Sequence, residues 1–99
     1  MTNKQSILAK IPVIFFEEGD KLIAYSPALD LSTCGDNLEQ AKKRFAEAAT
    51  IFINEASQMG TLEEVLAECG WQKTPSGQAW TPPLYVGQLQ EEIEIPAVR

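Results

Sequence analysis

The sequence predicts an α+β fold, in which a small antiparallel sheet in β-β-β-α order packs on one long helix, followed by a second short helix and a C-terminal strand. Residues 11–17 and 21–26 are rich in β-branched and aromatic side chains and flank the turn Glu18-Gly19-Asp20, which is typical of a hairpin. Apolar residues then recur at three- and four-residue steps from Leu38 to Ala56, which predicts a long helix. The 99 residues are enough for one domain with a single core.

The expected sheet has a third strand and two different faces. Pro27 ends the second strand, and residues 31–34 (LSTC) predict the third. Alternation along the second strand separates its side chains into two sets, Leu22, Ala24 and Ser26 on one face and Ile23 and Tyr25 on the other. Neither set is wholly polar, so we expect the helix to cover one face and a partner to cover the other.

Both helices carry start and stop signals. We expect Asp36 to cap the long helix, with Glu39 reaching back in a capping box, and Gly60 to end it. Thr61 is expected to begin the second helix, with Glu64 in its capping-box position, and Gly70 to stop it. Trp71 follows directly and is placed to fold back on the last turn.

The chain changes character after Trp71, so we expect a core at residues 1–71 and a C-terminal loop and strand at 72–99. Residues 72–79 are polar and rich in turn formers. In residues 88–95, Leu89, Ile93 and Ile95 alternate with Gln90, Glu92 and Glu94, which predicts a half-buried strand. This strand either completes the same domain or pairs with another subunit, which makes a homo-oligomer (dimer or tetramer) an expectation.

Composition narrows the functional classes. The formal net charge of −6 argues against nucleic acid as a direct ligand, because phosphate binding needs a basic surface. No apolar run is long enough to cross a membrane, and residues 1–10 hold no apolar leader, so we expect a cytoplasmic protein. Cys34 and Cys69 fit free thiols in a reducing compartment, and a disulfide between them stays open as an alternative.

No catalytic constellation is recognisable in the sequence. Because histidine is absent, the Ser-His-Asp and Cys-His systems cannot form, and no Gly-rich loop with a lysine precedes a helix. Among the acidic residues, Asp30 has the weakest structural explanation, since it lies in a loop between Leu29 and Leu31. We therefore expect no enzyme, no catalytic residue, no metal and no cofactor. A small metal-dependent hydrolase using Asp30 is the least favoured alternative.

The ordered motifs resemble the HicB-like antitoxin family, whose members are protein partners of HicA ribonuclease toxins. The matching residues are 24–27 (AYSP), Leu29 and 35–41 (GDNLEQA), and downstream 59–66 (MGTLEEVL) and 70–71 (GW). The resemblance runs from Val13 to Trp71 and implies a partial ribonuclease-H-like fold of β-β-β-α-β order without ribonuclease activity. The turn after Pro27 departs from the family pattern, and the tail has neither the DNA-binding module of many members nor a basic face.

The resemblance implies that this chain neutralises a small basic HicA-type toxin by covering its RNA-binding face. The residues that we expect at the contact are Glu17, Glu18, Asp20, Tyr25, Pro27 and Asp30. The alternative is a stand-alone oligomeric structural or regulatory domain without a toxin partner, in which residues 89–95 associate through sheet edges.

Overall fold

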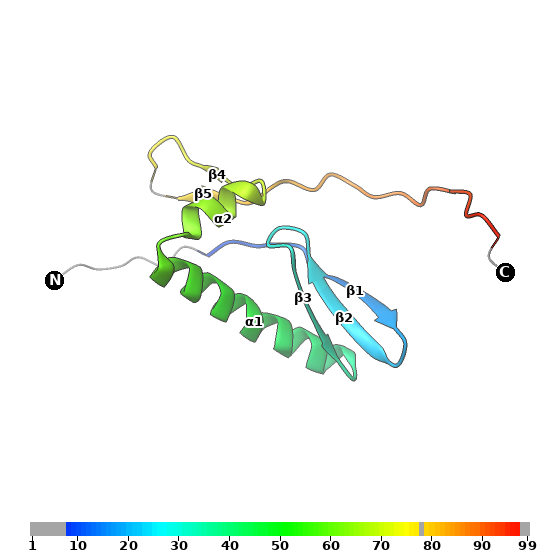
Figure 1. The fold of residues 1–99 in the computed structure, drawn as a ribbon. Helices are drawn as coiled ribbons and strands as arrows, with labels where there is room; N and C mark the ends of the chain where they lie inside the picture. Colours follow the sequence, from blue (N-terminus) through cyan, green and yellow to red (C-terminus); the bar gives the residue numbers. More distant parts are fainter. Residues whose placement is uncertain (1–7, 78, 98–99) are drawn as a thin grey trace.

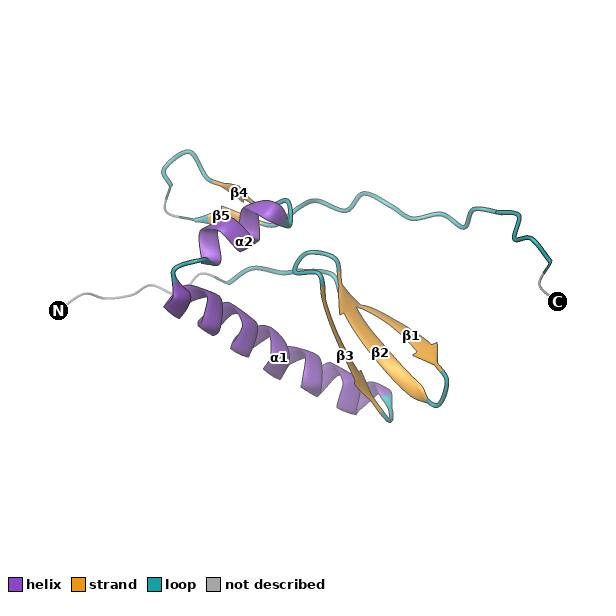
Figure 2. Cartoon of the chain, in the orientation of Figure 1, coloured by secondary structure: helices purple, strands orange, loops and turns teal. Residues whose placement is uncertain are grey.

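The computed structural model describes residues 8–77 and 79–97 and confirms the α+β class (Figures 1 and 2). A three-stranded antiparallel sheet packs on a long helix, and a short helix and a two-stranded sheet follow. The elements in chain order are β1 (Ile14–Glu18), β2 (Lys21–Ser26), β3 (Leu31–Gly35), α1 (Leu38–Met59), α2 (Leu62–Glu68), β4 (Gln72–Lys73) and β5 (Trp80–Thr81).

The three-stranded sheet has the order β1-β2-β3, so β2 is central and the other two strands are edges. The predicted hairpin is confirmed, with Gly19 in the left-handed region at φ 64° in its turn. The register places Ile14, Tyr25 and Ser32 in one row across the sheet. The neighbouring row in the same phase contains Phe16, Ile23 and Cys34. These rows form one face of the sheet, and Ala24 lies on the other.

Helix α1 covers the face that carries Ala24. Ala24 and Ala41 are fully buried, and Phe45 fills the space between the helix and the sheet. Gly35, the last residue of β3, makes this approach close, because a Cβ atom there would lie 2.6 Å from the backbone nitrogen of Ala41. The backbones of β3 and α1 are therefore in direct contact at Gly35 and Ala41.

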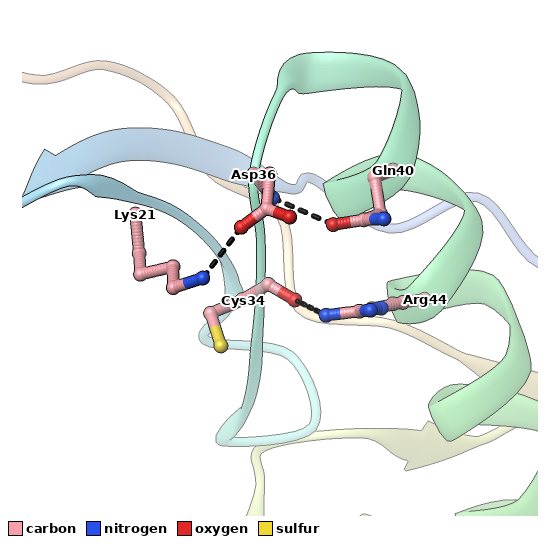
Figure 3. Close-up of polar contacts among 5 residues, drawn as sticks. All are labelled: Lys21, Cys34, Asp36, Gln40 and Arg44. Atoms are coloured by element: carbon pink, nitrogen blue, oxygen red, sulfur yellow. Dashed lines mark hydrogen bonds and ion pairs between the residues drawn. The ribbon is translucent and has the colours of Figure 1, made fainter.

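The cap of α1 differs from the expected one. Asn37 is the N-cap, and its Oδ1 accepts a 2.8 Å hydrogen bond from the Gln40 backbone N–H. The Gln40 Oε1 accepts a 2.7 Å hydrogen bond from the Asp36 backbone N–H, so a reciprocal arrangement related to the expected capping box forms around Asn37. The Asp36 carboxylate is not the cap, because it binds Lys21 across the end of the sheet (Figure 3).

The junction between the helices is partly as expected. Gly60 ends α1 at φ 75°, in the left-handed conformation typical of a helix C-terminus. Helix α2 follows, but the Thr61 side chain makes no capping hydrogen bond to it. The Thr61 hydroxyl instead donates to the Ala56 carbonyl of α1 at 3.4 Å. Thr61 is therefore the N-cap residue of α2, as expected, but it lacks the side-chain hydrogen bond of a capping box.

Trp71 closes a second part of the core. The chain turns at Gly70 (φ 93°), and the Trp71 backbone N–H donates to the Leu66 carbonyl at 2.9 Å. Its side chain is buried with Leu66, Ala28 and Leu29. The predicted return of Trp71 onto α2 is confirmed, and it brings α2 against the loop between β2 and β3.

The C-terminal residues do not form the predicted strand. Strands β4 and β5 instead form a two-stranded antiparallel sheet, in which Lys73 pairs with Trp80. Residues 82–97 contain no strand, and Figure 1 shows them projecting away from β5. The alternation at residues 89–95 is compatible with a strand, but a strand also needs a neighbour for its backbone groups, and no described residue supplies one.

Two further sequence expectations bear on the described residues. No helix among them is both long and apolar enough to cross a membrane. Cys34 and Cys69 are both free thiols, the first exposed and the second half-buried.

Candidate protein-binding site

The loop between β2 and β3, residues 27–30, is held by hydrogen bonds from two sides. The Ala28 backbone N–H donates to the hydroxyl of Ser26, which is fully buried, at 3.2 Å. The Ala28 carbonyl accepts a 2.8 Å hydrogen bond from the indole Nε1 of Trp71, which is 43 positions later in the chain. Ala28 and Leu29, in the middle of the loop, are buried. Pro27 and Asp30, at its two ends, are half-buried and exposed, respectively.

Asp30 occupies an unusual backbone position. Its φ is +50°, in the left-handed region that residues other than glycine adopt rarely and that aspartate and asparagine tolerate best. The Tyr25 hydroxyl donates to the Asp30 Oδ1 at 3.1 Å. This bond joins the end of β2 to the start of β3 and places a carboxylate beside a phenol at the surface.

Tyr25 and Asp30 border an open hollow of about 570 Å³ between this loop and the two helices. The loop forms one wall, and α1 and α2 form the other. The residues around the hollow are Tyr25, Pro27, Leu29, Asp30, Phe52, Val65, Glu68 and Cys69. Its charged groups are two carboxylates, those of Asp30 and Glu68.

The electrostatics of the hollow favour positive charge. The hydrogen bond to Asp30 raises the pKa of the Tyr25 phenol, and desolvation and the Asp30 charge act in the same direction. Burial raises the pKa of the Cys69 thiol, and the charges of Asp30 and Glu68 raise it further. Both shifts show that an added negative charge is disfavoured in this hollow. The carboxylates of Asp30 and Glu68 would attract a positive charge.

The structure separates the six expected contact residues into two groups. Tyr25, Pro27 and Asp30 come together at the hollow. Glu17, Glu18 and Asp20 are exposed at the β1–β2 turn, at the other end of the sheet. Because β2 spans six residues, the two groups are separated by about 17 Å along the strand. They are therefore two acidic sites on one molecule.

The end of the sheet near the β1–β2 turn also carries charged side chains on two other elements (Figure 3). Lys21 forms an ion pair with Asp36, which raises the pKa of the Lys21 ammonium and lowers the pKa of the Asp36 carboxyl. Arg44 of α1 donates to the Cys34 carbonyl of β3 at 3.1 Å. Both basic side chains are thus bound within the chain, while the acidic turn extends beyond them.

The sheet face opposite α1 is open and carries exposed apolar side chains. Ile14 is 48% exposed and Phe16 is 44% exposed, and Ile23 lies beside Phe16 in the register. No described element covers this face, since α1 packs on the other one. The sequence-based expectation of one covered face is confirmed. A partner on the second face stays a prediction.

Sequence reasoning missed the helical wall of the hollow. Phe52, Val65 and Cys69 fit the apolar faces of their helices, and Glu68 is one of several acidic residues on α2. Their common position depends on Trp71, which holds α2 against the loop. The signal in the sequence was the Gly70-Trp71 pair, but it does not reveal which loop the indole reaches.

The described part of the chain contains no cluster of three or more His, Cys, Asp or Glu side chains that is arranged to hold a metal ion. No family model matches the chain, and no curated protein and no solved structure matches it either.

Proposed function

We propose that this chain is an antitoxin-like binding protein that neutralises a small basic HicA-type ribonuclease toxin by covering its RNA-binding face. The observation that carries the proposal is the hollow beside Asp30, whose charged groups are both acidic and whose shape is fixed by the Trp71–Ala28 bond. The motif resemblance from Val13 to Trp71 supports the choice of partner. We place this action in the cytoplasm.

Neutralisation in this proposal requires no chemical step by this chain. Lysine or arginine side chains that contact RNA phosphates on the toxin pair with Asp30 and Glu68 instead. The ring of Tyr25 offers an apolar and cation-binding surface beside them. A toxin held in this way is excluded from its RNA by both steric overlap and charge.

The second acidic group has a different role in the proposal. Glu17, Glu18 and Asp20 are exposed at the tip of the hairpin, and the chain carries a net charge of −6. Exposed charges of this kind accelerate the encounter with an oppositely charged partner more than they strengthen the final complex. We therefore assign steering to the β1–β2 turn and binding to the hollow.

Co-purification tests the proposal directly. The chain is expressed together with the product of the adjacent gene, and only one of the two proteins carries an affinity tag. The proposal predicts a complex with a small basic protein and loss of that protein's RNA cleavage in the complex. A neighbour that is neither small and basic nor a ribonuclease, or that fails to bind, contradicts the proposal.

One structural observation favours the alternative of an oligomeric structural or regulatory domain. Leu89, Ile93 and Ile95 are each more than 70% exposed, on a segment without a neighbour among the described residues. Light scattering on the isolated chain examines this alternative, and a monomer at all concentrations would count against it.

A further inference from the structure

We propose that residues 84–95, here called the C-terminal arm, form a β-strand on the free edge of β1 in a second copy of this chain, and that two copies exchange arms reciprocally. This inference concerns self-association and does not rest on the proposed toxin partner. It starts from two features of the described residues: the arm pairs with no strand there, and the outer edge of β1 has no neighbouring strand.

The C-terminal arm has the side-chain pattern of a strand but not the surroundings of one. Its aliphatic residues Leu84, Val86, Leu89, Ile93 and Ile95 are between 73% and 92% exposed. In its second half, Leu89, Ile93 and Ile95 share one phase, opposite Gln90, Glu92 and Glu94. Exposing so much apolar surface on an isolated extended segment costs free energy in water. Pairing with a sheet edge would give its backbone groups hydrogen-bond partners and would bury its aliphatic side chains.

The β1 edge is the better of the two sheet edges for this purpose. At the β3 edge, Arg44 of α1 already donates to the Cys34 carbonyl. At the β1 edge, no backbone hydrogen bond from a described residue other than those to β2 is present. Ile14 and Phe16 lie there half-exposed on the open face. A strand added beside them places Leu89, Ile93 and Ile95 in line with that apolar surface.

The root of the C-terminal arm is held in a direction that leads away from its own body. Pro83 packs at Gly70, where a Cβ atom would lie 3.5 Å from the Pro83 Cγ. Tyr85 lies near enough to Tyr25 to influence the pKa of its phenol. Beyond this point the arm projects freely (Figure 1), and the chain extends over 64 × 29 × 22 Å with a radius of gyration of 16.9 Å. A compact chain of this length has a radius of gyration of about 13 Å.

A second copy of the chain supplies one strand partner for each arm and for each β1 edge. Each copy has one arm and one β1 edge, and among the residues that the structure describes no strand pairs with either of them. Reciprocal exchange through a two-fold axis fills both edges and closes the assembly, whereas one-way donation would leave an arm and an edge free. Closure also removes two exposed sheet edges that would otherwise pair without limit.

Light scattering combined with isotope-filtered NMR tests the proposal on the full chain. The wild type is expected to be a dimer, and a mixture of labelled and unlabelled chains is expected to show contacts between Ile93 of one copy and β1 of the other. Ile93→Asp is expected to raise the dimer dissociation constant by about 10- to 100-fold, since it removes one buried aliphatic side chain. Gln90→Asp, on the opposite phase of the arm, is the matched control and is expected to leave the constant within about threefold.

Three results would overturn the proposal. The first is a monomeric wild type, and the second is a dimer that Ile93→Asp and Gln90→Asp affect equally. The third is a set of arm-to-β1 contacts that occur only within one chain, which would show that the arm completes its own sheet. Circular dichroism of both variants verifies that the helices are retained, so that a loss of dimer cannot be confused with unfolding.

Discussion

The Tyr25 hydroxyl donates a 3.1 Å hydrogen bond to the Asp30 carboxylate across the base of the β2–β3 loop. Between residues 25 and 41, these are the two whose presence local folding explains least. Gly35, by contrast, has a structural role in its close contact with α1. The bond joins Tyr25 and Asp30 into one surface feature, which borders the acidic hollow.

The Tyr25–Asp30 bond predicts an alkaline titration. The pKa of the Tyr25 phenol lies above its ordinary value of 10.0, and Asp30→Asn is expected to lower it toward that value. Because the pKa of Tyr25 is raised in the folded state, the protonated phenol stabilises the fold. This contribution to the free energy of unfolding is complete below the pKa of the unfolded chain and is lost as the pH rises through the pKa of the folded chain. Site-resolved NMR of the Tyr25 ring carbon measures the shift. Asp20→Asn, at the far end of the sheet, is the control, and an equal effect of both variants contradicts the assignment.

The Trp71 indole is expected to contribute through its hydrogen bond as well as through its packing. Trp71→Phe retains an aromatic ring but leaves the buried Ala28 carbonyl without its donor. We expect a loss of about 1–3 kcal/mol in the free energy of unfolding, measured by urea denaturation followed by circular dichroism. Trp80→Phe changes a half-buried tryptophan in β5 and serves as the comparison. If both substitutions cost the same, the Ala28 bond has no special role.

Gly35 is expected to be intolerant of a side chain. In Gly35→Ala the new Cβ atom would lie 2.6 Å from the nitrogen and 3.0 Å from the Cα of Ala41, and neither backbone atom can move without displacing α1. We expect a loss of at least about 1–3 kcal/mol in the free energy of unfolding. Gly87→Ala is the matched control, because nothing lies within 4 Å of the new Cβ atom there. Thermal denaturation of the two variants should therefore separate them clearly.

Substitutions of Asn37 and Asp36 are expected to differ in their effect on stability, because only Asn37 caps α1. Asn37→Ala removes the acceptor of the Gln40 N–H and is expected to lower the free energy of unfolding by about 1 kcal/mol. Asn37→Asp keeps an acceptor at the same place and is expected to restore most of the loss. Chemical denaturation of both variants, beside Asp36→Ala, shows which residue is the cap. A larger loss in Asp36→Ala with little effect of Asn37→Ala would contradict the structure.

The local part of the fold was predictable because its causes are local. Gly19 in the hairpin turn, the apolar stripe that contains Ala41 and Phe45, and Gly60 at the end of α1 each act within a few residues. The cap was misplaced by one residue because Asp36 and Asn37 have equal intrinsic ability to cap. Lys21, which is distant in sequence, pairs with Asp36 and leaves the cap to Asn37.

Only part of the site was predictable, because the rest depends on contacts between residues that are distant in the sequence. Tyr25, Pro27 and Asp30 lie on one short segment, and the structure places all three of these expected residues at the hollow. Glu68 reaches the same hollow only because the Trp71 indole binds the Ala28 carbonyl, a contact between distant positions that no periodicity reveals. The alternation at residues 89–95 shows a strand pattern but not the location of its neighbour, which is why the predicted C-terminal strand is absent from the single chain.

The most direct test of the account is the affinity of this chain for the purified product of the adjacent gene, compared between two charge reversals. Asp30→Lys changes the hollow, and Glu47→Lys makes the same change on an exposed position of α1 outside it. Titration calorimetry is expected to show a dissociation constant that is at least about 30-fold weaker for Asp30→Lys than for Glu47→Lys. Equal dissociation constants for the two variants, or no binding by the wild type, would contradict the claim that the hollow beside Asp30 binds a basic toxin.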